Sequence, residues 1–262
     1  MALLLCGANI AFAEESGVFF GFGVGYGDIK SSINATAMHG YKREILYDTT
    51  NKHRANGISY GLTAGYKQFI TESVGFRYYA NVDLTHANAI SILGESNNLS
   101  NSKYPILQTN LLNYGVNVDV LFNFVSNNAF DFGGFIGFGI GANMINGKYV
   151  DSLQQHKDDY VFQTSGGGLT LTDSKVQTTS LDIALNMGLR TNIAKYHGIE
   201  LAVRVPLIPI KTLDVGMRYD VAIGTYVDVA GKLQDIFAEG KSTSKATLGQ
   251  NFRVLARYTF SF

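Results

Sequence analysis

Hydrophobic and polar residues alternate with a period of two in eight separate segments of the chain. A period of two places successive side chains on opposite faces of a β-strand, and in outer-membrane barrels one face meets lipid while the other meets the lumen. In the clearest segment, 112–124, apolar residues occupy every position of one face, opposite Asn113, Asn117 and Asp119. The segments are 18–26, 58–67, 74–84, 112–124, 132–141, 181–193, 199–205 and 252–262.

The lengths of the connections predict how these segments are joined. Short links follow the second, fourth and sixth segments, whereas long polar links follow the others, at about 27–56, 86–109, 144–178 and 207–246. Short periplasmic turns that alternate with long extracellular loops are typical of outer-membrane barrels, and an even strand count leaves both chain ends in the periplasm. We therefore predict one all-β domain, a transmembrane antiparallel up-and-down β-barrel of eight strands with long extracellular loops.

A further alternating stretch, residues 215–223, leaves a ten-stranded barrel open as the alternative. If this stretch crossed the membrane alone, Phe262 would end outside the cell. A second extra crossing would then be required, and residues 231–244 are polar and more typical of a helix than of a strand. We therefore assign 215–223 to an external hairpin or strand extension.

The N-terminus has the pattern of a signal peptide. A short apolar run ends in Ala11-Phe12-Ala13, the small-x-small spacing of a cleavage site. We expect residues 1–13 to be the signal peptide and residues 14–262 to be the mature barrel. Cys6 lies inside the predicted signal, and the bulky Leu5 before it disfavours lipoprotein processing, so the mature chain has no cysteine. No apolar run reaches the 18 residues of a membrane-spanning helix.

The predicted lumen face carries both cations and anions. Side chains fill the interior of an eight-stranded barrel, and a buried charge must be paired, since an unpaired one costs several kcal/mol. Arg190 and Glu200 flank the same tight turn, and Arg257 on the last strand can reach Glu200. We interpret this set as a structural ion-pair core; the alternative is a narrow ion path. The charge network comprises Arg77, Asp83, Asp119, Asp182, Arg190, Glu200, Arg204, Arg253 and Arg257, with Lys67 also inward.

Catalytic and cofactor chemistry have little support in the sequence. His39, His53, His86 and His156 lie in or beside the predicted external loops, and no pair has catalytic or metal-ligand spacing. The glycine-rich pieces lie inside strand patterns with no helix after them, which excludes a nucleotide-binding loop. A net charge of zero gives no argument for nucleic acid as a partner. We predict a protein that is not an enzyme and binds no metal or cofactor.

Residues 186–192, Asn-Met-Gly-Leu-Arg-Thr-Asn, and 197–206, His-Gly-Ile-Glu-Leu-Ala-Val-Arg-Val-Pro, resemble the Helicobacter outer membrane protein family, the Hop-like porins and adhesins. The last six residues fit the Tyr-x-Phe ending of that family, and the specific resemblance covers about 128–262. The resemblance implies exposure at the cell surface and, in some members, adhesion to host glycans or receptors. Such adhesion belongs to members with a large added extracellular domain, for which this chain has no room.

Together these patterns predict an integral outer-membrane protein with a structural role or a role in surface interaction and adhesion. A narrow pore for small solutes or ions is the alternative. The expected partners are outer-membrane lipids, the barrel-assembly machinery during biogenesis, and a host or surface ligand at the extracellular loops.

The aromatic residues Tyr258, Phe260 and Phe262 resemble the C-terminal signal that the barrel-assembly machinery recognises. We predict that deletion of residues 258–262 leaves the protein in the periplasm or degraded, because the last strand can then be neither recognised nor paired. Immunoblots of fractionated cells measure this outcome. Normal levels of the shortened chain in the outer membrane would contradict it.

Overall fold

The computed structural model describes residues 16–38, 45–90, 106–127, 130–156, 169–227, 229 and 231–262. The predicted signal peptide and His39 lie outside these ranges. The elements are β1 (Gly17–Met38), β2 (Ile45–Phe69), β3 (Val74–Ile90), β4 (Ile106–Ser126), β5 (Phe130–Asn146), α1 (Lys148–His156), β6 (Leu169–Val176), β7 (Thr179–Ile193), β8 (His197–Pro206), β9 (Ile210–Val227) and β10 (Leu233–Ser261).

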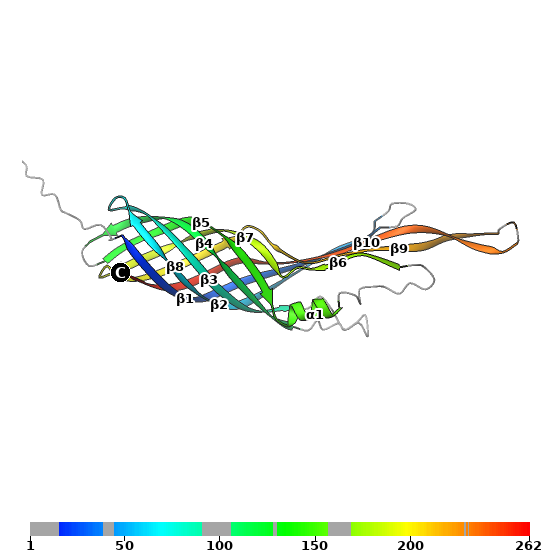
Figure 1. Cartoon of the computed structure of the whole chain (residues 1–262), viewed down its shortest axis with the longest axis horizontal. Helices are drawn as coiled ribbons and strands as arrows, with labels where there is room; N and C mark the ends of the chain where they lie inside the picture. Colours follow the sequence, from blue (N-terminus) through cyan, green and yellow to red (C-terminus); the bar gives the residue numbers. More distant parts are fainter. Residues whose placement is uncertain are drawn as a thin grey trace, which may run out of the picture.

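Eight of the described strands form a closed antiparallel ring in the order β1-β2-β3-β4-β5-β7-β8-β10, and β10 pairs again with β1 (Figure 1). The seam between β1 and β10 begins at Phe19 opposite Ser261 and continues without a break past Tyr26 opposite Val254. A closed ring gives every strand two neighbours, which a bilayer requires because its core offers no water to unpaired backbone groups. The prediction of an eight-stranded barrel is confirmed.

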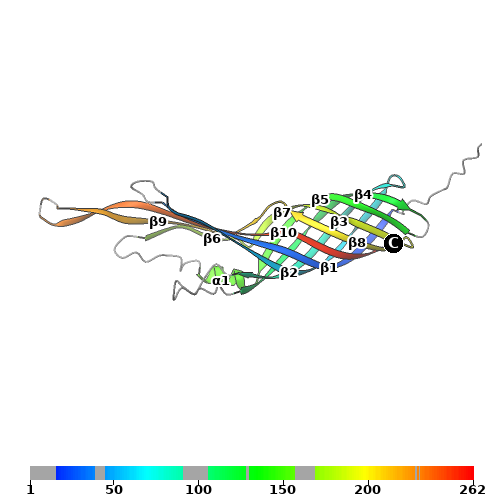
Figure 2. The ribbon, with the colours of Figure 1, turned by 180° about the vertical axis from the view of Figure 1, so that it is seen from behind.

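β9 does not enter this ring. It pairs with the outer part of β10, from Val227 opposite Leu233 to Ile210 opposite Leu248, and on its other side with β6. The assignment of residues 215–223 to a strand extension outside the membrane is therefore confirmed. The outer parts of β2, β1 and β10 continue into the same sheet, so that β2, β1, β10, β9 and β6 project from one side of the barrel mouth (Figures 1 and 2).

The structure corrects the prediction that 27–56 and 207–246 are long loops. β1, β2, β9 and β10 occupy most of these residues, and β10 begins at Leu233 rather than at Phe252. Residues 231–244, which we expected to be more typical of a helix, lie mostly in β10. These strands stand in water on the extracellular side, so polar residues are acceptable on both faces and the hydrophobic alternation that marks a membrane strand is weak. Residues 144–178 contain α1 and β6.

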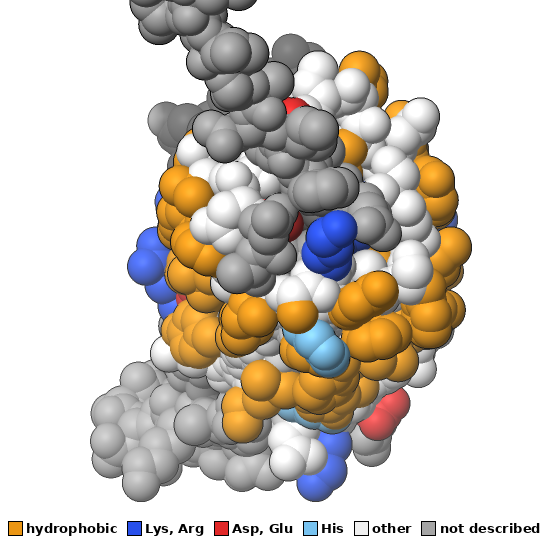
Figure 3. Space-filling model, turned by 90° about the vertical axis from the view of Figure 1, so that its left-hand side faces the viewer, with side chains coloured by type: hydrophobic (Ala, Val, Ile, Leu, Met, Phe, Trp, Pro, Cys, Tyr) orange, Lys and Arg blue, Asp and Glu red, His pale blue; other side chains and the backbone are white. Residues whose placement is uncertain are grey.

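The alternation of faces follows the prediction along all eight barrel strands. On β4, Val116 and Val118 are exposed while Asn117 and Asp119 are buried. A view of the end that holds the C-terminus shows hydrophobic side chains around the barrel (Figure 3). Aromatic residues contact one another at this end: Phe260 lies 5.0 Å from Phe262, measured between ring centroids. No helix among the described residues is long and apolar enough to cross a bilayer.

The tight turn between β7 and β8 sets the register of the barrel charges. The link between the paired residues Ile193 and His197 has three residues, and two of them, Ala194 and Lys195, have positive φ values of 51° and 67°. The register that follows from this tight link places Arg190 directly opposite Glu200.

The closed seam predicts a disulfide between engineered cysteines at Val24 and Ala256, which are partners on β1 and β10. Partner Cα atoms in an antiparallel pair are about 4.5–5.5 Å apart, within the range of a disulfide. The Val24→Cys/Ala256→Cys variant should form the bond in outer membranes, as measured by a mobility shift on non-reducing gels. The control Val24→Cys/Val203→Cys, with its second cysteine on β8, should stay reduced; bonding in the control alone would contradict the closed ring.

Candidate functional site

The centre of the barrel lumen is occupied by the side chain of Arg77 on β3. Its guanidinium donates to Asp119 on the adjacent β4 from Nη2 (2.7 Å) and Nε (3.1 Å), and it also pairs with Glu200 on β8. β3 and β8 lie four places apart in a ring of eight strands, so the pair with Glu200 spans the full width of the lumen. Arg257 on β10 pairs with the second oxygen of Glu200 at 3.2 Å.

Three aromatic rings surround the Arg77 guanidinium. Its central carbon lies 4.5 Å from the ring centroid of Phe135, 4.9 Å from that of Tyr79 and 5.6 Å from that of Phe19. A cation over an aromatic face is attracted by the ring, the more so where water is excluded. The ion pairs and the rings therefore hold this charge at the middle of the lumen.

A second layer of polar side chains lies nearer the outer mouth. Arg253 pairs with Asp83 at 2.6 Å and Arg204 pairs with Asp182 at 2.5 Å. Asparagine amides connect these pairs across the lumen: Arg204 donates to Asn117 at 2.7 Å. The amides that take part in this network belong to Asn81, Asn113, Asn117, Asn143 and Asn186.

Two cavities within the lumen show how completely these layers fill it. One borders Arg204 and Arg253, the other borders Lys67 and Arg190, and each has a volume of about 10 Å³. That is about the space that one water molecule needs. The lumen is therefore packed with side chains at the levels of both cavities.

The outer mouth of the barrel is closed by a cluster of buried apolar side chains. Members of the cluster come from opposite sides of the ring, with Ile29 on β1 and Ile145 on β5, and α1 contributes Tyr149 and Val150. Burial raises the pKa of Tyr149, so its hydroxyl stays neutral. The whole cluster is Ile29, Ala87, Leu111, Ile145, Tyr149, Val150, Ile210, Ala246 and Leu248.

The structure brings most of the predicted charge network together. The nine charged side chains are all buried, and eight of them take part in the ion pairs above. Arg190 lies opposite Glu200 in register, and its guanidinium carbon lies 5.5 Å from the ring centroid of Phe69. The asparagine network, Phe135 and the apolar cluster at the mouth were not predicted from the sequence. Strict alternation would have placed Phe135 inward, on the same face as Gly133 and Gly137.

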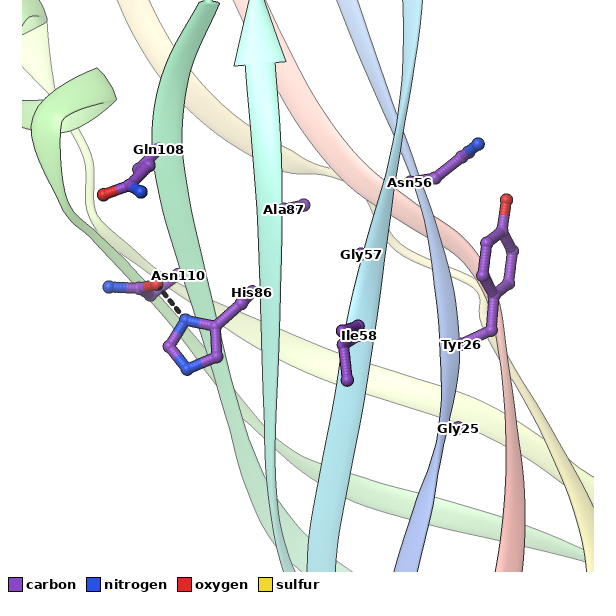
Figure 4. A pocket seen from close by; sticks show the side chains of 9 residues that line it. All are labelled: Gly25, Tyr26, Asn56, Gly57, Ile58, His86, Ala87, Gln108 and Asn110. Atoms are coloured by element: carbon purple, nitrogen blue, oxygen red, sulfur yellow. Dashed lines mark hydrogen bonds between the residues drawn. The ribbon is translucent and has the colours of Figure 1, made fainter.

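The histidines do not converge on one site within the described part of the chain. His86 on β3 contacts the Tyr60 hydroxyl through Nε2 and lies 2.5 Å from Asn110 Oδ1 through Nδ1. It borders a cavity of about 660 Å³ near the outer rim, together with Tyr26 and Ile58 (Figure 4). The structure does not describe the side chains of His53 and His156, and His197 lies at the other end of the barrel, 2.7 Å from the Tyr258 hydroxyl.

Metal binding has no candidate among the described residues. They contain no cluster of three or more His, Cys, Asp or Glu side chains that could hold a metal ion.

Comparison with known proteins identifies a family. The model of a family described as Helicobacter outer membrane protein matches residues 61–262. Among solved structures, OprG of Pseudomonas aeruginosa aligns at 12% identity and a TM-score of 0.45, over 95% of this chain and 98% of that one. Neisserial surface protein A aligns at 14% identity and a TM-score of 0.33, over 94% of this chain and 99% of that one. Ail of Yersinia pestis aligns at 11% identity and a TM-score of 0.26, over 90% of this chain and 98% of that one. No curated protein matches the sequence significantly.

The buried pair of Arg253 and Asp83 predicts a stability defect that a second substitution reverses. Arg253→Met leaves Asp83 as an unpaired buried charge, and we expect a loss of about 3–5 kcal/mol in the free energy of unfolding. Arg253→Met/Asp83→Asn removes both charges and should recover most of this loss. Urea titration followed by the shift in gel mobility measures both variants. Equal stability of the single and double variants would contradict the role of the pair.

Proposed function

Because the chain belongs to the Helicobacter outer membrane protein family, we propose that it is a closed, non-conducting barrel that anchors a β-sheet at the cell surface for interaction with outside partners. The observation that carries this proposal is the filling of the lumen by the Arg77–Glu200 pair, which spans it from β3 to β8. Membership of the family also places the chain in the outer membrane.

The non-conducting part of the proposal rests on two separate barriers. At the centre, ion movement would require the separation of buried charges, which costs several kcal/mol for each ion left unpaired. At the outer mouth, the apolar cluster with Tyr149 and Val150 excludes water. These two barriers favour an anchor over the narrow pore that we kept as the alternative.

The surface role rests on the position of the extension, the sheet that β2, β1, β10, β9 and β6 form beyond the barrel mouth. Five strands continue beyond the mouth, and three of them, β1, β2 and β10, are the same strands that cross the membrane. The extension therefore stands on a rigid support, and its exposed residues are available to a host or surface ligand. Export through a signal peptide at residues 1–13 and insertion through Tyr258, Phe260 and Phe262 belong to the same proposal.

Recordings in planar bilayers test the proposal. We expect no reproducible conductance steps from the purified, folded protein, because the lumen has no continuous water path. A variant with residues 148–156 replaced by a Gly-Ser linker should also be silent, since the ion pairs beneath α1 still fill the lumen.

A general porin, prepared and added in the same way, provides the positive control for insertion. Reproducible steps from the intact protein would overturn the anchor and restore the pore. Steps from the linker variant alone would show that the charge network does not close the lumen by itself.

A further inference from the structure

We propose that the outer surface of the barrel, where the extension leaves the membrane, binds the phosphorylated headgroup of an outer-leaflet glycolipid. The site is formed by Lys30, Lys52 and Arg54, together with an apolar wall at Leu207 and Ile208. The site is separate from the lumen, so lipid binding there does not depend on whether the lumen conducts.

Strand pairing gathers the three cations in one place. Lys30 on β1 is the direct partner of Arg54 on β2, and the next pair on the same face is Ser32 with Lys52. This row continues across the seam between β1 and β10. Ser32 is also the partner of Thr247, and Thr247 is in turn the partner of Lys211 on β9. Lys52, Arg54 and Lys211 are exposed, and Lys30 is half-buried.

The three cations have no counter-ion among the side chains that the structure describes. Lys30, Lys52 and Arg54 form no ion pair with any of these side chains. The acid nearest to Lys30 in sequence is Asp28, whose side chain is buried and accepts a hydrogen bond from Asn251 at 2.7 Å. Like charges crowded together in this way repel one another until an anion is bound between them.

The three cations lie at the level along the strands where the lipid headgroups are expected. Tyr26 and Ile58, paired with each other, are the last large apolar residues of the lipid-facing surface on β1 and β2. Lys30 follows Tyr26 by four residues on the same face, about 13 Å along the strand and less along the membrane normal because barrel strands are tilted. Long cationic side chains at this level reach the polar headgroups while their stems stay near apolar atoms.

The site also has an apolar part, which distinguishes a lipid from a free anion. Lys30 and Lys52 border a cavity of about 310 Å³ whose other side is formed by residues 206–209, the link between β8 and β9. Leu207 and Ile208 in this link are 52% and 36% exposed. The Leu207 amide donates to the Ile183 carbonyl at 2.7 Å, which fixes the link against the barrel wall. An acyl chain that follows the barrel surface would contact these residues while its headgroup meets the cations.

Binding of lipid A to the folded protein in phosphatidylcholine nanodiscs tests the proposal. We expect phosphorylated lipid A to bind about tenfold more tightly than dephosphorylated lipid A, the sum of three modest ion pairs at the surface. Lys30→Gln/Lys52→Gln/Arg54→Gln should abolish this difference. The matched control Lys148→Gln/Lys175→Gln/Lys195→Gln removes the same charge elsewhere and should retain it, and a gel-mobility assay confirms that both variants fold.

Two further measurements separate the lipid from other anions. Leu207→Ser/Ile208→Ser should weaken the binding of lipid A but not that of inorganic phosphate. The proposal is overturned if the triple variant still prefers phosphorylated over dephosphorylated lipid A as strongly as the native chain does. It is also overturned if inorganic phosphate or a soluble sulfated polysaccharide competes with lipid A at equal phosphate or sulfate concentration, because the site would then recognise charge alone.

Discussion

A bilayer accepts a β-sheet only if every backbone donor and acceptor has a partner, and in this chain the pairing of β1 with β10 meets that demand. The two strands lie at opposite ends of the sequence, so the ring closes only when the whole chain has been made and the last strand is in place. Closure at eight strands then sets the width of the lumen. A lumen of this width has to be filled, and the chemistry of its interior follows from that.

The interior within the membrane is built mainly from charged and amide side chains, beside a small apolar cluster of Leu121, Phe135, Ala202 and Leu255. Lipid covers the outside of the barrel, so most apolar residues of the membrane strands face that surface, and the polar residues that remain inside must satisfy one another. Arg77 shows how this works, since two carboxylates and three aromatic rings meet at one guanidinium. At the outer mouth, where the strands leave the bilayer, the inside becomes apolar, as in a water-soluble protein.

This change of environment explains how far the sequence could be interpreted. Within the membrane the period of two is strong, and it predicted the faces of all eight strands, the buried position of the charges and the tight turn before Glu200. Outside the membrane neither face of the sheet meets lipid, so segments such as 231–244 lack the period of two and were expected to be more typical of a helix. The partner of each charge across the lumen was also beyond the sequence, because it depends on which strands face one another in a ring that the chain order does not specify. Glu200 was the exception: its ion pair with Arg257 was expected from the position of the last strand, and the local turn placed Arg190 opposite it.

The outer sheet is joined to the barrel by strands that do not end at the membrane surface. β1 and β10 remain paired from Phe19 and Ser261 to Met38 and Lys241, along the direction in which the extension projects (Figure 1). A force that pulls on the outer end therefore acts along these strands. It loads many hydrogen bonds in shear at the same time, whereas a hinged loop would let them peel apart singly. The resistance of the outer sheet to such a force thus comes from the same seam that closes the barrel in the membrane.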